Sequence, residues 1–140
     1  MPLFDCPFAL YQDGIYRPTL QIRIINPHTG MSQRTYGIID TGADECAVPA
    51  SYAGLLGHDL KAGNQKNVST GNGEAVAYTH TTKFEIFNPS TGQVAYTIQD
   101  APIDFLENLH VILLGVHSFL SNFILRIDYP HKIFSIRHPK

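Results

Sequence analysis

One aspartate occupies a position in which its carboxylate could take part in acid–base chemistry. Asp40 follows the apolar pair Ile38-Ile39 and precedes the small residues of Thr41-Gly42-Ala43. An apolar strand would therefore carry the aspartate into a tight turn that another backbone can approach closely. A positioned carboxylate can act as a general acid or base. On its own, however, an Asp-Thr-Gly tripeptide favours an exposed β-turn, so the surrounding elements must decide between the two interpretations.

The other chemically capable side chains form no catalytic or metal-binding pattern. None of the seven histidines lies in a His-Glu-x-x-His motif, and the nearest pair, His110 and His117, brackets an apolar strand end. Surface or capping histidines are therefore favoured over a metal site. Cys46 has no paired histidine in the sequence, and the acidic pair Asp44-Glu45 is most simply a solvated turn. We expect neither a metal nor a cofactor.

The elements that must position Asp40 are mostly β-strands. The segment Leu20–Ile24 alternates apolar and polar residues with a period of two, which predicts a strand with one buried face. Two stretches predict short helices, Ala50–Leu56 and Val116–Ser121. The remaining predicted strands are Tyr36–Ile39, Ala75–Tyr78, Phe84–Phe87, Val94–Ile98, Phe123–Ile127 and Ile133–Ile136.

Two loops share the pattern Asn-Pro-x-Thr-Gly, at Asn26–Gly30 and Asn88–Gly92. Proline presets one backbone angle and glycine permits a positive one, so both segments predict hairpin loops. Each hairpin is followed by an apolar strand that ends at a small-residue turn, Ile38–Gly42 and Val111–Gly115. This predicts two structural half-repeats, one with a carboxylate where the other has leucine. Convergent hairpin chemistry is the alternative.

A third hairpin is predicted at Gly71-Asn72-Gly73, because Asn-Gly is a strong hairpin signal. The residues before it are polar, so this hairpin is expected to stand clear of the core.

The composition is that of a globular domain. With 140 residues, 44% hydrophobic residues and a formal net charge of -2, the chain can bury a core as one domain. The near-neutral balance argues against nucleic-acid binding. The apolar run Val111–Leu114 is too short to span a membrane, and no secretory signal is recognisable at the N-terminus, so a cytoplasmic location is expected.

These segments, in this order, resemble the retropepsin-like family of aspartic proteases, the single-domain dimeric relatives of the pepsins. The resemblance rests on Asp40-Thr41-Gly42-Ala43, the Gly71–Gly73 hairpin, Leu113-Leu114-Gly115 and the short helix and strands that follow. It covers the chain from about Thr19 to Ile136. It implies an all-β, closed barrel-like acid-protease fold with one or two short helices and a flap hairpin, with residues 1–140 as a single domain.

The family's chemistry implies a homodimer. Peptide hydrolysis by this class uses two carboxylates that share one proton across a water molecule. The chain contains a single Asp-Thr-Gly and no Asp-Ser-Gly. Two copies must therefore meet about a two-fold axis that brings their Asp40 residues together.

The resemblance also implies roles for neighbouring residues. Asp40, Thr41 and Gly42 form the catalytic turn, with Thr41 bonding across the dimer axis and Gly42 admitting substrate backbone. Ala43 and Asp44 line the groove. The flap tip, formed by Gly71, Asn72 and Gly73, closes over an extended peptide or protein substrate.

One departure from the family pattern concerns the dimer contact. Many retroviral members carry arginine where this chain has Val116, and that arginine pairs with the acidic residue equivalent to Asp44. Asp44 then needs another partner, for which Arg17, Arg126 and Arg137 are the candidates.

Two other functions remain open from the sequence. The first is a catalytically silent module of the same fold that serves dimerisation or peptide binding. The second is an unrelated β-rich module in which Asp-Thr-Gly is only a turn.

Overall fold

The computed structural model describes residues 2–71 and 73–139, which are mainly β-strands. The strands are β1 (Leu3–Pro7), β2 (Ala9–Leu10), β3 (Tyr16–Arg17), β4 (Thr19–Ile25), β5 (Ser32–Ile39), β6 (Cys46–Pro49), β7 (Asn64–Thr70), β8 (Gly73–Phe87), β9 (Val94–Leu106), β10 (Ile112–Leu114), β11 (Ile124–Asp128) and β12 (Ile133–Arg137). The helical elements are α1 (Ser51–Leu55) and two short 3-10 helices, η1 (Leu60–Ala62) and η2 (Leu120–Asn122).

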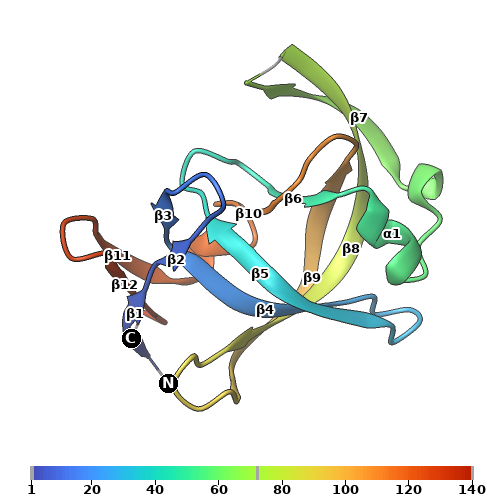
Figure 1. Ribbon diagram of the computed structural model, residues 1–140. Helices are drawn as coiled ribbons and strands as arrows, with labels where there is room; N and C mark the ends of the chain where they lie inside the picture. The colour runs from blue at the N-terminus through green and yellow to red at the C-terminus, as the bar shows by residue number, and fades with distance from the viewer. Residues whose placement is uncertain (1, 72, 140) are drawn as a thin grey trace.

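The main sheet closes on itself. Its seven strands have the order β4-β5-β10-β6-β9-β8-β7, and β4 also pairs with β8. This additional pairing closes a barrel from which β7 extends, and Figure 1 shows the β7–β8 hairpin projecting from the barrel at the upper right. The predicted all-β, closed barrel-like fold is confirmed.

Alternating side chains of the strands fill the barrel. In β4, Leu20, Ile22 and Ile24 are at most 2% exposed, whereas the polar residues between them are partly exposed. The rings of Phe84 and Phe119 meet edge to face inside, 5.1 Å apart. Burial of each such side chain contributes roughly 1.5–3 kcal/mol to stability.

The two Asn-Pro-x-Thr-Gly segments form the same hairpin loop. The N–H of Gly30 donates to the carbonyl of Asn26, and that of Gly92 donates to the carbonyl of Asn88, both at 2.8 Å. In each loop the asparagine side chain accepts the N–H two residues later, at 2.9 and 2.8 Å. The two glycines have φ values of 76° and 74°, a conformation that glycine adopts at little cost. Both predicted hairpins are confirmed.

The topology also supports two half-repeats, β4-β5-β6-α1 and β8-β9-β10-η2, but it corrects part of their predicted alignment. In this arrangement β5 is equivalent to β9, and β6 is equivalent to β10. The strand pairing agrees with this equivalence, because β5 runs parallel to β10 and β9 runs parallel to β6. The Asp40 turn therefore corresponds to the turn after β9, at 107–111, and not to Leu113-Leu114-Gly115. That segment lies beside Ile38–Ile39 as its parallel neighbour. The predicted alignment is wrong because β5 and β10 have similar sequences: both are apolar and both lead into small-residue turns. Only the strand pairing shows that β10 is the neighbour of β5 in the sheet and not its equivalent in the other half.

Of the two predicted helices, the first is confirmed as α1 and the second is a turn. The N–H groups of Leu120 and Ser121 donate to the carbonyls of Gly115 and Val116, five residues back, which is wider than the four-residue spacing of an α-helix. Ser118 has a φ of 66°, in the left-handed region that interrupts a right-handed helix. Only the 3-10 helix η2 follows.

The two ends of the chain meet in a second sheet of order β1-β12-β11. Leu3 of β1 pairs with Ile136 of β12, and both side chains are buried. Figure 1 shows this sheet on the left of the barrel, next to both termini. No helix within residues 2–71 and 73–139 is long and apolar enough to cross a membrane.

Candidate active site

The turn after β5 carries the predicted catalytic residues. The N–H of Asp40 donates to the carbonyl of Leu114 at 3.1 Å, so the turn begins where β5 lies against β10. The Asp40 Oδ1 atom accepts the N–H of Gly42 at 3.0 Å, and the Asp40 carbonyl accepts the N–H of Ala43 at 3.2 Å. These bonds fix the carboxylate within the turn. Thr41 and Gly42 are exposed or partly exposed, which leaves the outer side of the turn accessible.

The segment after β10 holds this turn in place. A Cβ atom on Gly115 would lie only 2.4 Å from the carbonyl oxygen of Glu45, so the two backbones cross at van der Waals contact. The next two N–H groups donate to the carbonyls of Ala43 (2.9 Å) and Asp44 (2.7 Å). The Asp40 turn is therefore bonded to the barrel on both sides of Asp40.

A side-chain pair reinforces the same crossing. The Nδ1 atom of His117 lies 2.8 Å from Oε1 of Glu45, while the other carboxylate oxygen of Glu45 is buried without a hydrogen-bond partner. Within the described ranges, none of the three arginines suggested for Asp44 forms an ion pair with it, and Arg17 is bonded to Asp13 instead. The Glu45–His117 pair thus lies beside the Asp40 turn, and sequence reasoning missed it. The glutamate directly after Asp44 was the available signal.

The predicted flap is the hairpin of β7 and β8. Asn72 lies outside the described residues, and Gly71 and Gly73 are exposed at the tip. Nearer the barrel, side chains of the hairpin form a small cluster with residues of β6, β9 and β10. The cluster has buried and partly buried members, which are Ala47, Ala77, Leu106, Val68, Ala75, Leu109 and Leu113. The hairpin therefore packs against the strand β10 that also supports Asp40.

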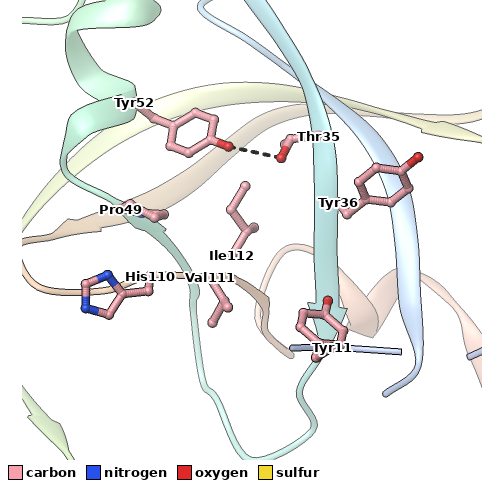
Figure 2. Close-up of a pocket in the computed structure, with 8 residues that line it drawn as sticks. All are labelled: Tyr11, Thr35, Tyr36, Pro49, Tyr52, His110, Val111 and Ile112. Carbon is pink, nitrogen blue, oxygen red and sulfur yellow. Dashed lines mark hydrogen bonds between the residues drawn. The ribbon is translucent and has the colours of Figure 1, made fainter. Parts of the chain in front are cut away.

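A separate pocket lies between β5, β6 and β10, with a volume of about 170 Å³. Figure 2 shows Thr35 and Tyr52 joined by a hydrogen bond of 3.0 Å at its upper edge, with Val111 and Ile112 below. The eight residues that line it come from outside the 40–44 turn and outside the β7–β8 hairpin. This pocket is therefore distinct from the candidate active site.

Cys46, next to Glu45, is sealed inside the barrel. It is 1% exposed, and burial raises the pKa of its thiol to about 12, although the N–H of Gly115 donates to its sulfur at 3.4 Å. A thiol with so little thiolate reacts slowly with alkylating reagents.

We predict that Cys46 resists alkylation at pH 8 in the native protein and reacts once the chain is unfolded. A Cys6→Ala variant isolates the Cys46 signal, and mass spectrometry after timed labelling measures it. Labelling of native Cys46 at the rate of the unfolded chain would show that the crossing at Gly115 opens readily.

Two histidines pack together where the β7–β8 hairpin joins the barrel. The rings of His58 and His80 are 4.4 Å apart, and both contact Phe105 edge-on. His80 Nε2 lies 2.9 Å from the carbonyl of Leu60, and the Nε2 atom of His58 is buried without a partner. Burial lowers the pKa of His58, and the imidazoles of His80 and His28 lower it further.

This arrangement predicts that the fold loses stability in mild acid. Because the folded pKa of His58 lies below its unfolded value of about 6.5, the unfolded chain binds the proton more readily as the pH falls below that value. The His58 contribution is fully present above about pH 6.5 and is lost as the pH falls through the folded pKa. A His58→Phe variant should therefore show a smaller drop in melting temperature between pH 7 and pH 5 than the wild type. The exposed His110→Phe variant is the control, and an equal drop in all three proteins would contradict the assignment.

No protein-family model matches the chain, and no curated protein matches its sequence. Among solved structures, a retropepsin-like aspartic protease from Rickettsia conorii matches with a TM-score of 0.68 and 21% sequence identity, over 99% of this chain and 91% of that one. The likeness rejects the interpretation of an unrelated β-rich module. The chain therefore has the fold of a retropepsin-like aspartic protease, as its sequence predicts.

Proposed function

We propose that the chain is an aspartic endopeptidase that hydrolyses peptide bonds as a homodimer, with residues 1–140 as one retropepsin-like domain. The observation that carries the proposal is the Asp40 turn. Its carboxylate is fixed by the N–H of Gly42, its backbone is bonded to the barrel on both sides, and its outer face is accessible. A carboxylate placed in this way on an aspartic-protease fold is suited to acid–base catalysis.

One copy supplies one Asp40, so the reaction needs two copies related by a two-fold axis. Two carboxylates held close together cannot both ionise cheaply, and they therefore share one proton and titrate as a unit. In the dimer, Thr41 bonds across the axis and keeps the two turns together.

The reaction follows from this shared proton. The ionised Asp40 accepts a proton from a water molecule whose oxygen attacks the scissile carbonyl carbon. The partner's Asp40 donates its proton to the carbonyl oxygen, which gives a neutral tetrahedral intermediate. This intermediate collapses as the carbon–nitrogen bond breaks: the protonated carboxyl group gives its proton to the leaving amine, and the ionised carboxylate accepts a hydroxyl proton from the intermediate, which restores the singly protonated pair.

The substrate is an extended peptide or protein segment. It lies as an added strand between the catalytic turn and the β7–β8 hairpin, held mainly by backbone hydrogen bonds. Gly42 admits its backbone, Ala43 and Asp44 line the groove, and the tip at Gly71, Asn72 and Gly73 closes over it. Closure excludes water other than the attacking molecule.

The test is digestion of a diverse peptide mixture by the purified chain from pH 4 to pH 7, with products identified by mass spectrometry. We expect cleavage at internal peptide bonds, with apolar residues enriched beside the cleaved bond. A folded dimer that cleaves no peptide at any pH would overturn the proposal and favour a silent peptide-binding module.

A further inference from the structure

A continuous strip of side chains connects the catalytic turn to a buried charge. Across neighbouring strands, the register pairs Ile38 with Leu113, Leu113 with Ala47, Ala47 with Asp104 and Asp104 with Thr79. Register partners on adjacent strands point to the same face of a sheet. Asp104 therefore lies on the face that carries Leu113 and the apolar cluster beneath the β7–β8 hairpin.

Ile38, on this face, lies two residues before Asp40, which directly follows the last residue of β5. Three steps between neighbouring strands, each about 4.8 Å, separate β5 from β9, so Asp104 lies on the order of 14 Å from the strand that carries Asp40. An extended peptide rises about 3.3 Å per residue, so this distance spans about four residues of substrate.

Asp104 is the one charged residue among these register partners. It is 4% exposed, its Oδ1 atom accepts the hydroxyl of Thr79 at 2.8 Å, and its Oδ2 atom lies 3.0 Å from the Nζ atom of Lys66. A carboxylate buried this deeply is costly unless it is paired. Its cation comes from β7, the first strand of the projecting hairpin, and the Lys66 side chain is 41% exposed.

Lys66 is therefore the accessible half of the pair. Its neighbour Val68, two residues along β7, packs in the cluster with Leu113, which places Lys66 on the inner face of the hairpin. An ammonium group has three N–H donors, and Asp104 fixes the direction of one of them. The remaining donors of this partly exposed side chain are available to a substrate that binds below the hairpin in the proposed complex.

We infer that Lys66, held by Asp104 and Thr79, is a specificity-determining residue that selects a substrate side chain with a carboxylate or amide oxygen. This inference rests on the proposed function, because it concerns the substrate of that site. The selected side chain lies about four residues from the cleaved bond. Glutamate or glutamine is preferred there, and lysine or arginine is disfavoured by like-charge repulsion.

The test compares cleavage of a peptide library by the wild type, Lys66→Arg and the double variant Lys66→Met with Asp104→Asn. The double variant leaves no unpaired charge in the barrel, so it separates specificity from folding. We expect the wild type and Lys66→Arg to prefer glutamate over leucine at one position by roughly tenfold in kcat/KM, the effect of one charge-assisted hydrogen bond. The double variant should lose this preference to within about twofold while still cleaving peptides with leucine there.

The outcomes separate this inference from the proposed function. Cleavage with an unchanged preference in the double variant would overturn the role of Lys66 and leave the peptidase standing. If the wild type cleaves nothing, the same library is immobilised and binding is measured. Binding that loses its acidic preference only in the double variant supports Lys66 as the selector in a non-catalytic groove, and binding that is the same for all three proteins overturns the inference.

Discussion

Replacing Asp40 with asparagine is expected to lower kcat/KM for peptide cleavage by at least about 10³-fold, within the range that general acid–base catalysis contributes. The amide has almost the shape of the carboxylate, and its oxygen can still accept the N–H of Gly42 that now bonds to Oδ1 at 3.0 Å. The turn should keep its conformation, because the backbone bond from Asp40 to Leu114 does not involve the side chain. What is lost is the group that accepts and returns the proton. The measurement is the rate of cleavage of the best peptide from the mixture.

The Asp40→Asn variant should also fold and dimerise at least as well as the wild type, since it removes the negative charge that the two Asp40 side chains share at the dimer axis. Asp100→Asn is the matched control, because Asp100 is exposed on β9 and its φ of 53° is tolerated by asparagine. This control should retain full activity. Full activity in Asp40→Asn would mean that the catalytic group lies elsewhere.

Replacing Gly115 with alanine is expected to cost about 3 kcal/mol or more of unfolding free energy, from overpacking and the loss of two hydrogen bonds. The added Cβ atom would lie 2.4 Å from the carbonyl oxygen of Glu45 and 2.8 Å from that of Ala43. Both neighbours are backbone atoms that cannot rotate away, so the crossing must widen. Widening breaks the bonds at 2.9 and 2.7 Å that hold the catalytic turn, and activity should fall with stability.

Urea unfolding measures this effect, with Gly54→Ala as the control. Gly54 lies in α1, and a Cβ atom added there would meet no packed neighbour within 4 Å. Alanine at this position should therefore be neutral or stabilise the helix by up to about 1 kcal/mol. Equal stability of the two variants would show that the crossing is not tightly packed.

Local chemistry made much of the fold predictable from the sequence. The Asn-Pro-x-Thr-Gly loops fix their own conformation through an asparagine side chain and a positive-φ glycine, so both hairpins follow from a few residues. The alternation in Leu20–Ile24 likewise predicts which face of β4 is buried. The position of Asp40 in a tight turn at the end of a strand could be predicted, because the apolar strand and the small residues around Asp40 are contiguous in the sequence.

Contacts between distant residues could not be predicted in this way. The crossing of Gly115 with Glu45 joins residues 70 positions apart, and which strands are neighbours depends on the intertwined pairing of the two halves. Asp104 lies in the part of β9 beyond the predicted strand Val94–Ile98, and its partner Lys66 emerges only from the register of β7, β8 and β9. The positive φ of Ser118, which ends the predicted second helix, has no comparable local signal.

The central claim is that each active site contains one Asp40 from each of two copies. The most direct test is to refold wild type and Asp40→Asn together in varied ratios, at constant total concentration, and to measure cleavage. Random pairing in a dimer predicts activity proportional to the square of the wild-type fraction, so an equal mixture should retain roughly a quarter of the wild-type activity. Activity proportional to the fraction itself, with half retained in the equal mixture, would contradict the claim, because it would mean that a single copy carries the complete catalytic site.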